Sequence, residues 1–411
     1  QIVPSVKGLY THPNPIGEVP PGALLRAQNI NIDREGVGET RRGFETLIDL
    51  GVSAGNVPLG IYYQDGLIYY YLLSGTFACV DLEGGHTSTL STDYGSPSPL
   101  QAPLSAEANG NLYFTTNIGV ARLERTGDTP AFTGRAGIPK GLDGYAVTSG
   151  SSGWMENNTA VAYRVCYSYI GANGIKMVGA PTSRFIATNN TGGTRTVDIT
   201  FTVPAEINTS YFYQIYRSIQ TENYTDEPLD EMQLVVEKQF TSSDISAKSV
   251  TYTDQTPEEI LGATLYTSPS QEGILQENDR PPYAVSIGYY KNMMFYMNTA
   301  TPQRVFMTII SVGGTLGLQV NDTITIDGVT YTGKSAENAA AGQFLVATSG
   351  TTAQNIDDTT RSLVRIINRY ASNTTNYAFY LSGYQDLPGK VLIEGREPVS
   401  SVFSVTSSRG T

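Results

Sequence analysis

Apolar and polar residues alternate along several short segments of the chain, which is the pattern of a half-buried β-strand. In residues 159–170, TAVAYRVCYSYI, one face carries Val161, Tyr163, Val165, Tyr167 and Tyr169. Residues 195–204, RTVDITFTVP, alternate again through Val197, Ile199, Phe201 and Val203. About seven such segments follow one another between residues 154 and 267, a spacing that is typical of a β-sandwich.

A second pattern combines a short strand, a tight turn, an aromatic strand, a second turn and a closing strand. It occurs three times, in residues 58–85, 104–127 and 283–309. Asp65-Gly66 in the first copy and Asn109-Gly110 in the second are dipeptides that favour two-residue hairpin turns. Repeated antiparallel units of this kind predict blades of a β-propeller, here made discontinuous by the segments between them.

A helical period appears in residues 351–371, TTAQNIDDTTRSLVRIINRYA. Spacings of four and three residues place five side chains on one helical face: Ile356, Thr360, Leu363, Ile367 and Tyr370. Thr352 or Asn355 is the expected N-cap. A hairpin around Asp327-Gly328 precedes this helix and two strand-like segments follow it. We therefore expect a small α+β module in which one helix covers a sheet.

These elements divide the chain into five parts. Residues 1–150 hold an extended arm and the first propeller blades, and residues 151–268 form the β-sandwich. Residues 269–311 return to a propeller blade, 312–394 form the α+β module, and 395–411 begin the next blade. Because the chain starts without Met and ends within a strand pattern, we expect it to be part of a longer protein.

The charge balance argues against a surface that binds nucleic acid throughout. The chain has 411 residues, with 26 Lys and Arg against 38 Asp and Glu, which gives a formal net charge of -12. Such a chain repels polyanions. The 27 tyrosines, against one tryptophan, favour strands over helices. Cys79 and Cys166 lie far apart without metal-ligand spacing, so we expect two buried, reduced thiols.

Residues 29–44, NINIDREGVGETRRGF, allow three interpretations. Asn29, Asn31 and Asp33 have the spacing of the first calcium ligands in an EF-hand loop. That loop requires Gly at position 6 and Glu at position 12, where this chain has Arg34 and Thr40. The calcium interpretation therefore fails.

The paired arginines of the same segment could contact phosphate. Three nearby carboxylates make the segment roughly neutral, which weakens that interpretation: Asp33, Glu35 and Glu39. A hairpin remains, in which Ile30 and Ile32 point inward and glycines serve the turns. The arginines would brace the hairpin or a neighbouring subunit. The structural and interface candidates are Asp33, Gly36, Arg41, Arg42 and Gly43.

Catalytic signals are weak. His12 and His86 lie in loop-like segments without a nucleophile motif, and no phosphate-binding, dinucleotide or zinc motif occurs in the sequence. Four carboxylates cluster in YTDEPLDEMQ, residues 224–233, at Asp226, Glu227, Asp230 and Glu231. A glycosidase pair could be built from such residues, but a solvated loop explains them more simply. We expect no enzyme, no cofactor and no metal.

The order of several segments resembles that in one family of virion proteins. AQNINIDREGVGETRRGF resembles the start of its propeller, and YRVCYSYIGANGIKMVGAPTS resembles the first strands of its fibronectin- or immunoglobulin-like insert. FYQIYRS and TYTDQTPEEILGATL are similar to the closing half of that insert. NDRPPYAVSIGYYKNMMFYMN resembles the return to the propeller, and FSVTSSRG the next blade. The family is the tail nozzle, or tail tubular protein B, of short-tailed bacteriophages.

The resemblance implies a mainly β protein, with a discontinuous β-propeller and an inserted fibronectin/immunoglobulin-like β-sandwich. The small α+β insert at 312–394, which the residues themselves predict, is less typical of the family. It also implies a virion protein that forms a hexameric ring at the distal end of the tail. Such a ring would join the tail adaptor or tube protein, carry fibres or tip proteins, contact DNA during ejection and meet the host envelope. Acidic side chains would line its lumen. The alternatives are a receptor- or glycan-binding tail fibre or spike, and a propeller glycosidase.

Overall fold

The computed structural model describes residues 53, 55–64, 66–81, 87–91, 103–126, 129–265, 278–382, 388–397 and 403–409. It also describes the short pieces 8–9, 23–24, 30–34, 37–40, 267–268 and 273–274. The protein is mainly β, with several antiparallel sheets and two α-helices among the described residues. It divides into two units: residues 1–53 with 82–85, and residues 54–81 with 86–411.

The first unit contains two small strand pairs. β1 (Gly8–Leu9) pairs with β2 (Ala23–Leu24) in parallel, and β3 (Ile30–Arg34) pairs with β4 (Val37–Thr40) in antiparallel. The hairpin predicted in residues 29–44 is therefore present. β3 continues through Asp33 and Arg34, and β4 begins at Val37. Of the candidates, Gly36, Arg41, Arg42 and Gly43 lie outside the described residues.

Two four-stranded antiparallel sheets open the second unit. The first contains β5 (Pro58–Gln64), β6 (Leu67–Leu72), β7 (Phe77–Asp81) and β8 (Thr87–Ser91). The second contains β9 (Ser105–Ala108), β10 (Asn111–Thr116), β11 (Gly119–Thr126) and β12 (Thr129–Arg135). Asn109 and Gly110 connect β9 to β10 with φ of 51° and 74°. Two positive φ values are what a type I′ hairpin turn requires, so this predicted turn is confirmed.

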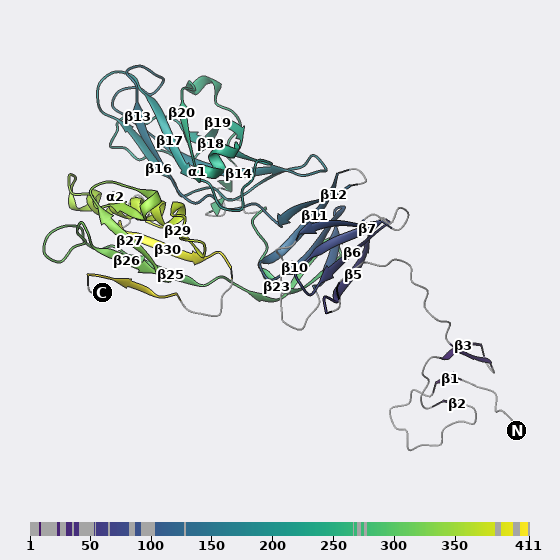
Figure 1. The fold of residues 1–411 in the computed structure, drawn as a ribbon. Coiled ribbons are helices and arrows are strands. Elements are labelled where there is room, and N and C mark those ends of the chain that lie inside the picture. Colours follow the sequence, from purple (N-terminus) through teal and green to yellow (C-terminus); the bar gives the residue numbers. More distant parts are fainter. Residues whose placement is uncertain are drawn as a thin grey trace, which may run out of the picture. The chain divides into compact units, whose positions relative to one another are not determined.

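These two sheets and a hairpin lie in three layers, which we call the stack (Figure 1). Leu112 and Phe114 of β10 pack against β6 and β7, with the Phe114 ring 4.3 Å from that of Phe77. Tyr113 lies on the opposite face and packs against β23 (Tyr283–Tyr290) and β24 (Met293–Ala300). Strand alternation thus gives the middle sheet two apolar faces.

The third predicted repeat is wrong at its end. β23 and β24 form the expected hairpin, but the third segment, β25 (Arg304–Thr308), does not pair with them. It pairs instead with β30 (Lys390–Gly395) of the following module. The sequence alone could not distinguish these partners, because β25 alternates in the same way in either sheet.

Residues 144–254 form two sheets around one core, which we call the two-sheet module. One sheet contains β13 (Gly144–Ser149), β17 (Thr196–Thr202) and β20 (Ser249–Asp254). The other contains β14 (Thr159–Ile170), β15 (Lys176–Val178), β16 (Phe185–Asn189), β18 (Tyr211–Ser218) and β19 (Met232–Gln239). The alternating residues of β14 and β17 face the shared core as predicted. The module begins at Gly144 rather than 151, because β13 pairs with β17.

One short helix in this module was not predicted. α1 (Ser242–Ala247) begins after Thr241, whose side chain and that of Asp244 form a capping box. At six residues, α1 is too short to show a helical period in the sequence. It connects β19 to β20, and so links the two sheets. A 3₁₀ turn follows β20 at Glu258–Ile260, before the small strand pair β21 (Thr267–Ser268) and β22 (Gly273–Ile274).

Residues 304–407 form the helix-covered module. One sheet contains β25, β30 and β29 (Asn376–Tyr380). The other contains β28 (Gln343–Leu345), β27 (Val329–Lys334), β26 (Thr323–Ile326) and β31 (Val405–Ser407), with a 3₁₀ turn at Ala339–Ala341 before β28. α2 (Thr352–Arg369) packs against both. β31 pairs with β26, so residues 405–407 belong here and not to a further blade, and the predicted limits of 312 and 394 were too narrow.

The predicted helix is confirmed in its face but not in its first residue. Ile356, Thr360, Leu363 and Ile367 are buried. The N-cap is Thr351, whose hydroxyl accepts the N–H of Gln354 while the Gln354 side chain accepts the N–H of Thr351. This capping box satisfies two of the first N–H groups, so the helix begins one residue earlier than a cap at Thr352 would allow.

Candidate functional site: a polar joint between modules

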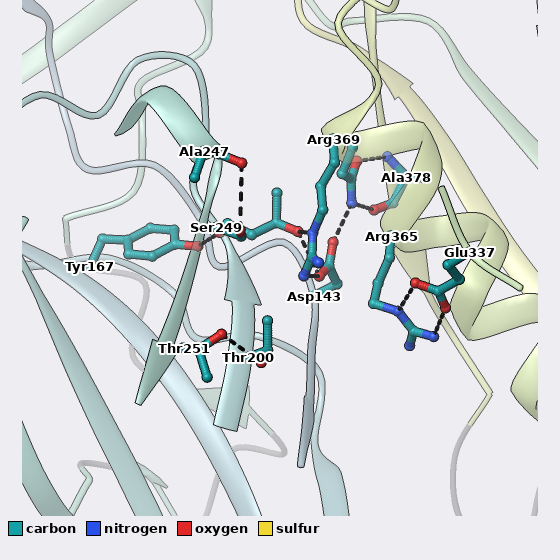
Figure 2. A network of polar contacts seen from close by, with 12 residues as sticks. Asp143, Tyr167, Thr200, Ala247, Ser249, Thr251, Glu337, Arg365, Arg369 and Ala378 are labelled. Atoms are coloured by element: carbon teal, nitrogen blue, oxygen red, sulfur yellow. Dashed lines mark hydrogen bonds and ion pairs between the residues drawn. The ribbon is translucent and has the colours of Figure 1, made fainter. Parts of the chain in front are cut away.

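Asp143, immediately before β13, joins the two-sheet module to α2. Its buried carboxylate accepts hydrogen bonds from the hydroxyl of Thr202 and the side-chain amide of Asn368, each at 2.8 Å. Arg369 lies beside it, with Nη2 3.6 Å from Oδ1, and donates from Nε to the Thr202 hydroxyl. Figure 2 shows Asp143 and Arg369 facing each other between the two modules.

Asn368 also fastens the last turn of α2 to its own sheet. Its side-chain amide donates to the carbonyl of Ala378 and accepts the N–H of the same residue, both at 2.8 Å. The two groups of one amide therefore bond β29, while the second N–H reaches Asp143. Because an amide has few orientations that satisfy all three bonds, the direction of the Asp143 contact is fixed.

Arg365 makes a second contact one turn earlier on α2. Its guanidinium lies 4.7 Å from the ring centroid of Tyr145 in β13 and pairs with Glu337 of its own module. Burial would raise the pKa of Glu337, but its hydrogen bond and ion pair with Arg365 lower it. Glu337 thus keeps its charge and holds the Arg365 guanidinium, as Figure 2 shows. The other contact of that guanidinium is the Tyr145 ring.

Glu206 is the point where all three modules meet. It lies between β17 and β18 and accepts from Nη1 of Arg280 at 2.8 Å and from the hydroxyl of Tyr377 at 2.6 Å. Arg280 precedes β23 of the stack, and Tyr377 lies in β29. Burial would raise the pKa of Glu206, but Arg280 and the bond from Tyr377 outweigh it and lower the pKa to about 2.

The stack and the helix-covered module meet beside this carboxylate. The Arg135 guanidinium, at the end of β12, lies 4.8 Å from the ring centroid of Tyr283. The Tyr283 hydroxyl donates to the carbonyl of Arg396 at 2.7 Å, and Arg135 donates to the same carbonyl at 3.3 Å. The Arg396 guanidinium in turn covers the Tyr377 ring, 4.2 Å from its centroid.

Gly137 lets the stack approach this point. Its φ is +80°, and an added Cβ would lie 2.6 Å from Cα of Arg280 and from the Asp279 carbonyl oxygen. Both atoms are backbone, so a larger side chain could be accommodated only if the chain moved. The N–H of Ile138 then bonds the carbonyl of Asn278 at 2.7 Å, which holds the Arg280 segment in place.

A further contact joins the stack to the two-sheet module. Glu124 of β11 is buried and pairs with Arg122 at 2.6 Å. It also accepts from the hydroxyl of Tyr169 in β14 at 3.0 Å and from the N–H of Ala172 at 3.1 Å. One carboxylate on the stack therefore receives two donors from the neighbouring module.

These contacts constitute what we call the joint: Glu124, Arg135, Asp143, Thr202, Glu206, Arg280, Tyr283, Asn368, Arg369, Tyr377 and Arg396. Removing one member of a buried charge pair leaves the other charge without compensation, which is strongly unfavourable. The joint therefore resists changes in the angles between modules. This arrangement suits a rigid scaffold, because the carboxylates of Glu124, Asp143 and Glu206 each accept at least two hydrogen bonds.

The joint contains none of the residues that the sequence analysis selected. Asp33 lies in β3 of the first unit, and the other four candidates lie outside the described residues. The joint residues are isolated charged or polar side chains, most of them at strand or helix ends or in connecting segments, without a recurring spacing. Two sequence features could have pointed to the joint: the isolated Asp143 just before a strand, and the arginines in the last turns of α2. Neither feature is specific to a contact between modules.

Within the described residues, no group of three or more His, Cys, Asp or Glu is arranged to hold a metal ion. No helix in the described part of the chain is long and apolar enough to cross a membrane. Cys79 and Cys166 are both buried and reduced, as expected from the sequence. Comparison with protein-family models and with curated proteins finds no match for this chain.

Proposed function

We propose that this protein is a structural component of a bacteriophage virion, the ring-shaped nozzle at the distal end of a short tail. In this role it forms part of the DNA ejection conduit and a platform for fibres or a tip. The observation that carries the proposal is the joint. Glu206 of the two-sheet module bonds both Arg280 of the stack and Tyr377 of the helix-covered module, which supports one stiff body made of separate modules.

The stack supports the finer proposal of a discontinuous β-propeller. Propeller blades are small antiparallel sheets that pack face to face. The stack has three such layers, interrupted between β12 and β23 by the two-sheet module. The outer face of β24 carries exposed Met293, Phe295 and Met297, an apolar surface that a further blade would cover.

The two inserted modules fit the same proposal. The two-sheet module is the proposed fibronectin/immunoglobulin-like β-sandwich, since two antiparallel sheets enclose one core of alternating residues. The helix-covered module is the proposed α+β insert. Both are fastened to the stack through charged side chains, which are direction-specific and keep inserted modules from rotating.

The net charge of -12 fits a conduit that releases DNA. A ring whose lumen is lined by acidic residues would repel the phosphate backbone instead of retaining it. The proposed partners are other copies of the chain, six in the ring as the family resemblance implies, together with an adaptor or tube protein above and fibres or tip proteins below.

Electron microscopy of phage particles labelled with an antibody against this chain tests the proposal. We expect label at the distal end of the tail, and native mass spectrometry of the assembled protein should give a ring of about six copies, the count that the family resemblance implies. Label on the head or only on fibres would reject the nozzle. A trimer would favour the alternative, a receptor- or glycan-binding fibre.

A further inference from the structure

A cleft of about 1240 Å³ opens between the two-sheet module and α2, beside the joint. Four arginines line it: Arg164, Arg184, Arg361 and Arg365. Only 16% of the chain is charged, so four guanidinium groups in one cleft are a strong local concentration. Arg361 and Arg365 belong to the wall formed by α2, the helix wall, and Arg164 and Arg184 to the opposite wall, formed by the two-sheet module. The two walls differ in how their arginines are neutralised.

The helix wall is neutralised by its own module. Arg361 donates from Nε to Asp357, one turn earlier in α2, at 2.8 Å, and lies 4.0 Å from the ring centroid of Tyr380. Arg365 pairs with Glu337 and lies against the Tyr145 ring, as described above. Both guanidinium groups are thus held by a carboxylate on one side and an aromatic ring on the other, which leaves them few directions in which to bond a ligand.

The opposite wall is neutralised by one loop. Arg164 of β14 pairs with Asp230 at 3.1 Å, and Arg184 pairs with Glu227 and donates to the carbonyl of Pro228 at 2.9 Å. Both carboxylates belong to the acidic loop, residues 219–231, between β18 and β19. The segment Glu227-Pro228-Leu229-Asp230 thus presents a carboxylate, a backbone carbonyl and a second carboxylate to two arginines. A bound acidic peptide would make the same contacts.

The arginine side chains of this wall are less exposed to solvent than the carboxylate side chains that pair with them. The side chains of Arg164 and Arg184 are 16% and 17% exposed, and Arg164 is also held by the carbonyl of Thr182 at 3.0 Å. The carboxylate side chains are 61% exposed at Asp230 and 36% at Glu227. Leu229 between them is 56% exposed. The arginines are therefore fixed, while Glu227 and Asp230 reach them from the solvent side through exposed pairs that contribute little individually. Pro228 between them is buried, and the start of the loop is bonded to Ala160 and Glu258.

We propose that the Arg164–Arg184 wall of the cleft is a docking site for an acidic segment of a partner protein. The acidic loop occupies this site as an internal competitor and is displaced when the partner binds. Because Arg184 pairs with Glu227 and Arg164 with Asp230, the site fits two carboxylates three residues apart. Asp357 and Asp358 on the facing helix wall disfavour a continuous polyanion such as duplex DNA.

The loop itself supplies the probe. A fluorescent peptide of residues 222–231, ENYTDEPLDE, is titrated into the wild-type chain and into Glu227→Gln/Asp230→Asn, in which the loop no longer competes. The loop in cis acts at a high effective concentration, so we expect the variant to bind the peptide at least about tenfold more tightly than the wild type. A matched peptide, with Gln and Asn in place of the same two residues, should not bind.

Two controls separate specific docking from other causes. Adding Arg164→Gln and Arg184→Gln to the loop variant should abolish binding, whereas Arg304→Gln, a mostly exposed arginine outside the cleft, should not. Absence of peptide binding by the folded loop variant would overturn the proposal. Equally tight, arginine-dependent binding of a short DNA duplex would also overturn it, in favour of a general polyanion site.

A measurement on the wild-type chain covers the case in which the loop variant does not fold. Excess peptide should accelerate amide hydrogen exchange within residues 219–231, because the displaced loop loses its contacts. Unchanged exchange at millimolar peptide would contradict the docking site. This inference does not depend on the nozzle proposal, since the particle-labelling experiment and the peptide titration can fail separately.

Discussion

The layers of the stack and the three modules at the joint are held together by opposite kinds of chemistry. Between β6, β7, β10 and β11 the contact is made by tyrosine, phenylalanine, leucine and alanine side chains. At the joint it is made by carboxylates, guanidinium groups and tyrosine hydroxyls. Apolar burial is strong but non-directional, so it stabilises contact without fixing an angle. Charged hydrogen bonds contribute less net free energy but depend on geometry, so they fix orientation.

The largest effect should come from removing an aromatic side chain from the stack. Phe114 is fully buried and stacks on Phe77. Phe114→Ala leaves a cavity, and we expect the free energy of unfolding to fall by about 3–5 kcal/mol in denaturant titrations. The matched control is Tyr63→Ala, because Tyr63 is exposed on β5 of the same stack. A similar loss in both variants would contradict the assignment of the core.

Breaking the joint should be less costly but should change orientation. Glu206→Gln keeps an acceptor for Tyr377 and leaves Arg280 without its counter-charge. We expect a loss of about 3 kcal/mol in the free energy of unfolding. Distances between spin labels on the two-sheet and helix-covered modules should also become broader. Phe114→Ala should leave those distances unchanged in the folded protein, and broadening in both variants would remove the distinction between the interfaces.

Acid should weaken the joint in a defined range. The pKa of Glu206 falls from an ordinary value of 4.5 to about 2 in the folded protein. A lowered folded-state pKa gives stability that is present above pH 4.5 and is lost as pH falls toward 2. The whole difference corresponds to up to about 3 kcal/mol, since the side chain is only 25% exposed. Unfolding measured from pH 6 to pH 2 should show a shallower decline in Glu206→Gln, and identical slopes would contradict this account.

The smallest effect should come from an exposed ion pair. Arg304 on β25 pairs with Glu394 on β30, and the Arg304 side chain is 56% exposed. Solvent screens such a pair, so Arg304→Gln should change the free energy of unfolding by less than about 1 kcal/mol. Thermal unfolding of the wild type and this variant provides the check. A loss as large as that of Glu206→Gln would mean that charge alone, without burial, determines the strength of these contacts.

The parts of the fold that the sequence predicted are those decided by neighbouring residues. The Asn109-Gly110 turn, the alternation of β14 and β17, and the buried face of α2 all follow from local φ preferences and from a period of two or 3.6 residues. The errors lie where a distant partner decides. β25 and β31 were assigned to blades, but each pairs with a strand of the helix-covered module.

The candidate site could not be predicted for the same reason. Asp143 and Asn368 are 225 positions apart, and Glu206 meets Tyr377 across 171 positions. Neither pair belongs to a motif, and the acidic residues of the 219–231 loop suggested only a solvated segment. Their contact with Arg164 and Arg184 depends on the fold, which places the loop beside both arginines.

The sequence by itself determined that this protein is mainly β, where the β9–β10 hairpin turns and which face of its long helix is buried. Those properties depend on backbone preferences and on the alternation of apolar side chains, which are written into consecutive residues. Only the tertiary structure decided which strands pair across modules, which charges meet at the joint and which arginines line the cleft. These depend on contacts between residues far apart in the chain, whose free energy appears only once the modules are folded.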